Sequence, residues 1–227
     1  MKMDIVAGSK YDEFYTPEYA IRPILKYLKQ NSKIWCPFDT EDSIFVKILR
    51  KENHIVICSH ISKSENFFHE AVNVEDADYI ISNPPYSKKN EVFERLFRLG
   101  KPFMMLVGVV GIFESQFRFN MFKDNDFEIM YFNKRISYFK DYSSQKLDVN
   151  PPFSSVYICH NVLPKQIIFE VLEDHKTIIK KESIIEEKNN PNMCNDCGFL
   201  ANTKDEFEKH LIRQFHLNSL TFEGERY

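Results

Sequence analysis

The chain has 227 residues and a formal net charge of −3, and only six of its residues are glycine. This length suffices for one domain of about 150–200 residues and a small appendage. The small negative charge excludes nucleic-acid binding that depends on the overall charge, so any such binding needs a local basic patch. No apolar run reaches about 18 residues and the N-terminus lacks a signal-peptide core, which predicts a soluble, cytoplasmic protein without a membrane partner.

The first part of the chain predicts two strands and two helices. Thr16 before Pro17 has the pattern of an N-cap followed by a first helical residue, and apolar residues at helical spacing continue to about residue 29. Buried strands are expected over 34–38 and 54–58, with an acidic turn at 39–42 and a helix over 43–51 between them.

A third strand, over 79–82, runs directly into Asn83-Pro84-Pro85-Tyr86. Two prolines end a strand because they cannot donate to a sheet ladder, and they hold the backbone open. The Asn83 side chain and the Tyr86 ring are therefore expected beyond the carboxyl end of the strand, where open α/β sheets bind ligands. Amide and carbonyl oxygens accept from an amine, and an aromatic ring stacks on a base, so the motif predicts a site for a flat heterocycle that carries an amino group.

The alternation of strands and helices continues to about residue 160. We expect a helix over 90–99 ended by Gly100, and strands over 103–109, 127–132 and 155–159. This order predicts a doubly wound, Rossmann-like α/β domain over residues 1–163. The Asn-Pro-Pro-aromatic pattern of residues 83–86 occurs again at Asn150-Pro151-Pro152-Phe153. This second copy precedes a strand, so we interpret it as a strand-entry turn and not as a second active site.

Residues 114–150 give weaker signals and carry basic side chains among Phe and Tyr. A flap that lies on nucleic acid and an ordinary solvated surface both fit this composition, and the surface is the favoured interpretation. The basic residues are Arg118, Lys123, Lys134, Arg135, Lys140 and Lys146.

The C-terminal part predicts a charged helical connector over 164–192 and a small ββα zinc finger over 193–220. The ligand spacing is that of a two-Cys, two-His site, and Thr203 with Glu206 forms a capping box that begins the histidine-bearing helix. Four protein ligands leave no open coordination position, so the zinc is expected to be structural. Contact with protein or with nucleic acid is open for this finger, because acidic side chains outnumber basic ones in it. The four ligands are Cys194, Cys197, His210 and His216.

With Asn83-Pro84-Pro85-Tyr86 after a strand and Phe14-Tyr15-Thr16-Pro17 upstream of the sheet, residues from about 10 to 160 resemble the S-adenosylmethionine-dependent adenine-N6 DNA methyltransferases, especially small phage-type members. The resemblance implies transfer of a methyl group to the exocyclic N6 amine of an adenine flipped out of DNA. Asn83 and Pro84 would hold the amine and Tyr86 would stack on the base, which is catalysis by positioning and electrostatics. A phage-encoded protein of this kind would act in the cytoplasm of the bacterial host.

The same resemblance implies cofactor contacts. Tyr15, Thr16 and Pro17 would hold the methionine end, and Asn66 with Phe67 stands where the family has an acidic residue and an aromatic one at the cofactor's adenine. The loop after the first strand would contribute Pro37, Phe38, Asp39 and Glu41.

That loop departs from the family pattern. It has no glycine, and its three carboxylates would repel the methionine carboxylate, although Asp39 or Glu41 could pair with the ammonium group. The second strand also ends in Cys58-Ser59-His60, where the family has an acidic residue for the ribose.

Two other functions stay open at this point. Related enzymes use the same motif on any planar amine-bearing group, so adenine in RNA or a glutamine amide in a protein is an alternative substrate. The glycine-free loop instead indicates a catalytically inactive, methyltransferase-like binding protein that counters host restriction or defence.

Overall fold

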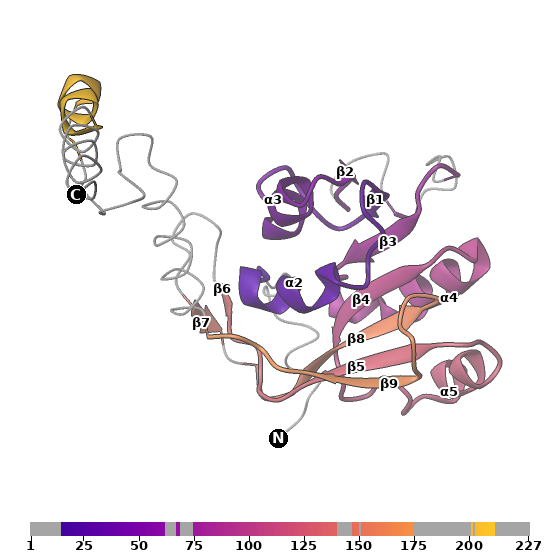
Figure 1. Ribbon diagram of the computed structural model, residues 1–227. Helices are drawn as coiled ribbons and strands as arrows, with labels where there is room; N and C mark the ends of the chain where they lie inside the picture. The colour runs from indigo at the N-terminus through magenta and orange to yellow at the C-terminus, as the bar shows by residue number, and fades with distance from the viewer. Residues whose placement is uncertain are drawn as a thin grey trace, which may run out of the picture. The chain divides into compact units, whose positions relative to one another are not determined.

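The computed structural model describes residues 15–61, 67–68, 75–139, 151–174, 201 and 203–211, and the backbone of 147–149. The chain divides into two compact units, Met1–Glu173 and Asp174–Tyr227. The first unit is built on a mostly parallel seven-stranded sheet flanked by helices (Figure 1), which confirms the predicted α/β class.

The sheet has the strand order β2-β1-β3-β4-β8-β5-β9. β2, β1, β3 and β4 are parallel, β8 runs antiparallel to both of its neighbours, and β9 is parallel to β5. The strands are β1 Lys33–Cys36, β2 Ile55–Cys58, β3 Tyr79–Ser82, β4 Phe103–Gly108, β5 Glu128–Phe132, β8 Ser155–His160 and β9 Ile167–Glu170. The chain leaves β1 on one side for β2 and returns on the other side for β3, so the topological switch point lies between the carboxyl ends of β1 and β3.

Helices cover both faces of the sheet. Val156 and Ile158 of β8 belong to the apolar cluster that also contains residues of α4 and α5, whereas the hydroxyl of Tyr157 between them donates to the carbonyl of Ala20 in α2, at 3.1 Å. The helices are α2 Glu18–Leu25, α3 Ile44–Lys51, α4 Lys89–Leu99 and α5 Gln116–Lys123. Every residue of β3 and β4 is buried, as expected for the middle of a sheet covered on both sides. Among the described residues, no helix is long and apolar enough to cross a membrane.

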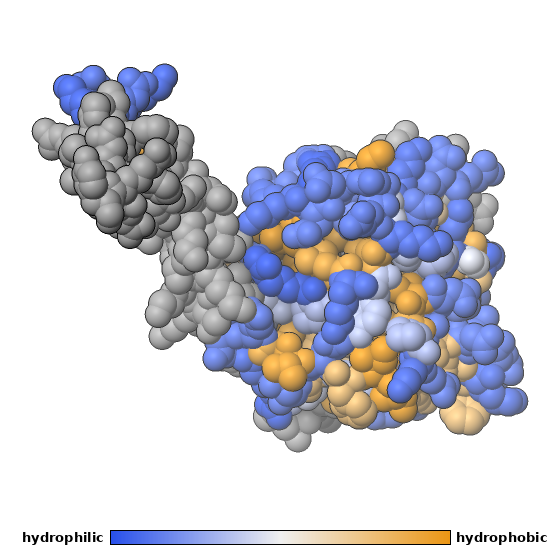
Figure 2. Space-filling model, viewed as in Figure 1, coloured by the Kyte–Doolittle hydropathy of each residue, from blue (hydrophilic) through white to orange (hydrophobic). Residues whose placement is uncertain are grey.

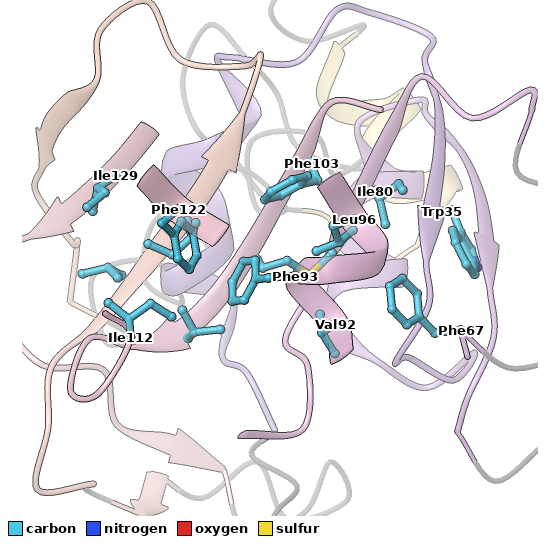
Figure 3. Packing of buried hydrophobic residues seen from close by; sticks show 14 of the residues in the cluster. Trp35, Phe67, Ile80, Val92, Phe93, Leu96, Phe103, Ile112, Phe122 and Ile129 are labelled. Carbon is cyan, nitrogen blue, oxygen red and sulfur yellow. The ribbon is translucent and has the colours of Figure 1, made fainter. Parts of the chain in front are cut away.

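Aromatic rings fill the layer between the sheet and α4 with α5. Phe93 of α4 lies between Phe103 of β4 and Phe122 of α5, with ring centroids 6.1 Å and 5.2 Å away (Figure 3). All three rings are buried. This packing fixes α4, and therefore the segment that connects β3 to it, on the sheet.

Two predicted helices need correction. The first begins at Glu18 with Pro17 at the N-cap, and Thr16 does not cap it; the Thr16 hydroxyl is instead buried and accepts a hydrogen bond from a distant residue. The helical connector predicted over 164–192 is wrong at Ile167–Glu170, which form β9, because so short an apolar run fits a strand as well as a helix. The first unit accordingly reaches Glu173 and does not end at residue 163.

The region 114–150, where the sequence pattern is weak, contains elements that were not predicted. α5 lies there, and Tyr138–Phe139 as β6 pairs antiparallel with Leu147–Val149 as β7. In the second unit, residues 204–211 are helical and Thr203 Oγ1 accepts from the backbone N–H of Glu206 at 3.2 Å, which confirms the predicted helix start. The predicted connector beyond residue 174 lies outside the described residues.

Gly100 ends α4 in the left-handed conformation, with φ 62°, as predicted. Gly100→Ala should lower the free energy of unfolding by about 1 kcal/mol, because a Cβ disfavours this φ. No neighbouring atom lies within 4 Å of the added carbon, so the loss is conformational. Urea unfolding measures it, and Gly100→Asn should lose less because Asn tolerates this conformation. An Ala variant as stable as the wild type would contradict the interpretation.

Candidate active site

The carboxyl ends of β1 and β3 meet at the switch point and carry the predicted site residues. The loop after β1 is held to the end of β2 by two backbone hydrogen bonds, from Asp39 N to Ser59 O at 3.0 Å and from Ser59 N to Cys36 O at 3.1 Å. Pro37 in this loop is buried and Phe38 is half-buried.

Asp39 joins three elements at this edge. Its carboxylate is buried and accepts hydrogen bonds from the hydroxyl of Ser43, the N-cap residue of α3, and from the hydroxyl of Ser82, the last residue of β3. Burial raises the pKa of Asp39 to about 6, although the two hydroxyl bonds and the nearby His60 lower it. The structure therefore gives Asp39 an internal role, and its contact with a cofactor stays a prediction.

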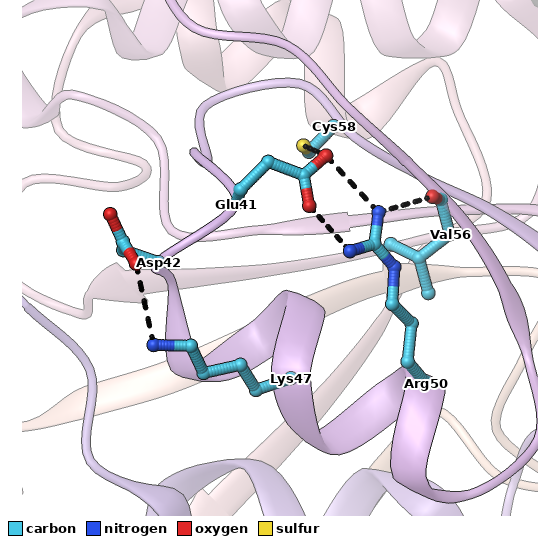
Figure 4. Close-up of polar contacts among 6 residues, drawn as sticks. All are labelled: Glu41, Asp42, Lys47, Arg50, Val56 and Cys58. Carbon is cyan, nitrogen blue, oxygen red and sulfur yellow. Dashed lines mark hydrogen bonds and ion pairs between the residues drawn. The ribbon is translucent and has the colours of Figure 1, made fainter.

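The other two carboxylates of the acidic turn are paired with basic side chains (Figure 4). Glu41 forms an ion pair with Arg50 and accepts from the Cys58 thiol at 3.1 Å, and Asp42 lies 3.6 Å from Lys47. These pairs offset the repulsion that the sequence suggests for this loop. The first pair also places the Glu41 carboxylate at the carboxyl end of β2, where the sequence itself has no acidic residue.

The motif after β3 contacts the segment that precedes α2. Asn83 Nδ2 donates to the buried Thr16 Oγ1 at 3.2 Å, although 67 positions separate the two residues. Thr16 is flanked by Pro17, which is buried, and Tyr15, whose carbonyl accepts from Phe139 N at 2.9 Å. The two sequence motifs that carry the family resemblance are thus brought together.

After Asn83 the chain turns into a short helix. Pro84 is buried, and Pro85 is the N-cap of the 3-10 helix Tyr86–Lys88, whose Lys88 N–H donates to the Pro85 carbonyl at 3.1 Å. Asn83 and Tyr86 are half-buried, so the motif stands at the border between core and solvent.

Tyr86 lies in an aromatic and hydroxyl-bearing wall that includes three residues of the 138–155 region. Its ring centroid is 5.5 Å from that of Phe153, and its hydroxyl is 3.4 Å from the hydroxyl of Tyr138, which is 2.8 Å from Ser155 Oγ. Burial raises the pKa of Tyr138 well above its ordinary value, so this hydroxyl keeps its proton. Lys89 Nζ is 5.1 Å from the centroid of the Tyr86 ring.

Phe153 reaches Tyr86 because β4 carries a glycine beside it. A Cβ on Gly108 would lie 2.7 Å from Phe153 Cε2, and Gly108 pairs with Ser155 at the start of β8. Sequence reasoning missed Tyr138, Ser155 and Gly108. The only sequence pattern that pointed to this part of the wall was the second Asn-Pro-Pro-aromatic run, which ends in Phe153.

A second aromatic group lies beyond β1. The ring centroid of Phe38 is 4.9 Å from that of Phe67 and 6.1 Å from that of Phe68, and the Phe67 and Phe68 centroids are 5.3 Å apart. Phe67 is buried, whereas Phe38 and Phe68 are half-buried and offer ring surface for a flat ligand. Asn66 lies outside the described residues.

The predicted zinc ligands fall mostly outside the part of the chain that the structure describes. His210 is half-buried in the helix 204–211, whereas Cys194, Cys197 and His216 lie outside the described residues. Within those residues no group of His, Cys, Asp and Glu side chains is arranged to hold a metal ion.

No protein-family model matches the sequence, and no curated protein matches it.

Asp39 makes stability depend on pH. Burial raises its pKa from 3.8 to about 6, so the folded protein favours the protonated carboxyl. The contribution of Asp39 to the free energy of unfolding is therefore present in full below about pH 4 and is lost as the pH rises through 6. The loss amounts to about 3 kcal/mol. Asp39→Asn lacks the charge and should gain about this much stability relative to the wild type between pH 4 and pH 8.

Urea unfolding across that pH range measures the difference between the two proteins. Asp124→Asn, at the exposed end of α5, controls for the loss of one carboxylate. If the difference in free energy of unfolding between Asp39→Asn and the wild type does not change with pH, the raised pKa of Asp39 is refuted.

Proposed function

We propose that this chain transfers a methyl group from S-adenosylmethionine to the N6 amine of adenine in DNA. The observation that carries the proposal is the position of Asn83-Pro84-Pro85-Tyr86 at the carboxyl end of β3, beside the switch point, with Asn83 bonded to Thr16. Ligands bind at this place in open α/β sheets. The motif supplies acceptors for an amine and a half-buried aromatic ring for a base.

The residues near β1 fit the parts of the cofactor. The half-buried rings of Phe38 and Phe68 suit its adenine, and the Glu41 carboxylate at the end of β2 suits hydroxyl groups of its ribose. The methionine end would lie by the segment that contains Thr16. When bound, S-adenosylmethionine supplies an electrophilic methyl group on a sulfonium.

The chain's own residues would act on the target amine by positioning. Asn83 Oδ1 and the Pro84 carbonyl accept its two N–H groups, which directs the nitrogen lone pair toward the methyl donor. The bond from Asn83 Nδ2 to Thr16 fixes the amide so that its oxygen serves the substrate. Tyr86 supplies the stacking ring, and Tyr138 and Phe153 hold that ring from the side. No strong base is needed, because the neutral amine would attack and the methylated nitrogen would then release one proton to water.

Basic side chains along the same edge favour a nucleic-acid substrate over a glutamine amide in a protein. β5 is parallel to β3, so the residues that follow both strands lie at one edge of the sheet. Lys88 follows β3, and Lys134 and Arg135 follow β5; all three are exposed, and Lys88 also lies 3.5 Å from Glu91. Cations placed beside a base-binding site suit phosphates.

Incubation with radiolabelled S-adenosylmethionine and either DNA, RNA or protein tests the proposal. Label should enter DNA, and Asn83→Ala should reduce the rate by about 100-fold or more, because it removes an acceptor aimed at the reacting amine. Asn120→Ala, an exposed residue on α5, is the matched control and should retain activity. Label in RNA or protein alone would reassign the substrate, and binding of the cofactor without transfer to any of them would favour the inactive binding protein.

We also propose that the C-terminal unit binds one structural zinc ion through Cys194, Cys197, His210 and His216. The confirmed helix start at Thr203 supports this, because it puts His210 on a helix as the ligand spacing requires.

Elemental analysis of the purified full chain should find one zinc per chain. Cys194→Ser should remove it, and so should a strong chelator, while the first unit stays folded. Cys58→Ser is the control, since that thiol donates to Glu41 and a hydroxyl can do the same. Zinc retained by Cys194→Ser would contradict the ligand set.

A further inference from the structure

The outer strand β9 exposes a regular apolar stripe. It is the last strand in the sheet order, and among the described strands it pairs only with β5 (Figure 1). Ile167, Phe169 and Val171 are 50%, 78% and 72% exposed, whereas Ile168 and Glu170 between them are half-buried. Apolar groups interrupt the polar surface over the part of the molecule where Figure 1 draws β5 and β9 (Figure 2).

The backbone of β9 presents hydrogen-bonding groups on the same outer edge. Ile129 N donates to Gln166 O at 2.7 Å and Asn133 N donates to Glu170 O at 3.2 Å, so the even-numbered residues turn their carbonyls toward the β5 side. Backbone groups alternate in direction along a strand. The N–H and C=O groups of Ile167, Phe169 and Val171 therefore point outward, away from β5.

Such an edge is unusual for a strand that remains alone. Exposed edges are commonly protected by proline, by charged side chains or by a bulge. Here the three residues with outward-pointing backbone groups are apolar, and two of them, Phe169 and Val171, are the most exposed large apolar side chains of the described residues. The edge has the properties of an interaction surface for another strand.

The sequence of this edge is complementary to itself. If two copies pair antiparallel about Phe169, the two Phe169 residues face each other and Ile167 faces Val171 of the second copy. In the same register, Lys165 faces Glu173 of the second copy at each end. Lys165 and Glu173 are exposed, and each lies just outside β9, two positions beyond Ile167 and Val171.

Other registers lose this match. Sliding one copy by two residues places Lys165 opposite Val171, or Glu173 opposite Ile167. Only the register centred on Phe169 joins apolar side chains to apolar ones and opposite charges to each other, and cross-strand pairs of both kinds stabilise antiparallel strands.

We propose that β9 is a dimerisation edge, through which a second copy of this chain pairs antiparallel about Phe169 and joins two seven-stranded sheets into one. The contact is isologous, so each copy uses the same surface and the assembly closes as a dimer. A one-strand contact buries less surface than a standard stable interface, so we expect the two copies to separate on dilution. The proposal does not depend on methyl transfer.

Sedimentation equilibrium of the full chain across the micromolar range tests it. The mass should rise with concentration from 27.0 kDa toward twice that value. Phe169→Lys should weaken the dimer at least tenfold, because two cations would then face each other. Phe119→Lys, on a side chain of α5 that is 53% exposed, should leave it unchanged.

Charge reversal tests the register separately from folding. Lys165→Glu and Glu173→Lys should each weaken the dimer by about tenfold, because each sets like charges opposite each other at both ends. An equimolar mixture of the two variants should form heterodimers about as tight as the wild type, since unlike charges then meet again. A wild-type chain that stays monomeric, a dimer that Phe169→Lys leaves intact, or a mixture without recovery would overturn the proposal.

Discussion

The buried carboxylate of Asp39 is the constraint on which the geometry of the site depends. It accepts hydrogen bonds from Ser43 at the start of α3 and from Ser82 at the end of β3. The backbone N–H of Asp39 donates to the carbonyl of Ser59, which follows β2. Three parallel strands are thereby tied at the edge where their carboxyl ends meet. Because Ser82 immediately precedes Asn83, the same bonds set where the Asn-Pro-Pro-Tyr motif leaves the sheet. An ionised carboxylate in this buried position is costly unless it is hydrogen-bonded, and both of its oxygens are.

The rest of the site is assembled from distant parts of the chain. Thr16 comes from the segment before α2 and bonds to Asn83, whereas Phe153 and Ser155 reach Tyr86 and Tyr138 because β8 is reversed and begins beside the end of β4. These contacts leave Tyr86 half-buried, with its hydroxyl and one part of its ring held. In the proposed function, a ring fixed in this way would stack on a base without first losing conformational freedom.

Local patterns in the sequence predicted the central elements well. β3 has the predicted bounds because its apolar run is ended by two prolines, and Gly100 ends α4 because no other residue type adopts its conformation so readily. Features that depend on tertiary contacts could not be predicted. Asp39 lies in a turn that reads as solvated, the Thr16 hydroxyl is used by Asn83 and not by the helix, and β9 has an apolar run too short to separate strand from helix. The position of Asn-Pro-Pro-Tyr at the carboxyl end of β3 was therefore predictable, whereas the network that holds the motif was not.

We propose above all that this edge of the sheet holds the site at which the N6 amine of adenine is methylated. Mass spectrometry of the nucleosides from DNA incubated with the protein and S-adenosylmethionine tests it most directly, because it identifies the modified atom and does not merely count methyl groups. Our account predicts N6-methyl-2′-deoxyadenosine, formed by the wild type and not by the Asn83→Ala variant. DNA in which only cytosine is methylated, or in which no nucleoside is modified although the protein binds S-adenosylmethionine, would contradict it.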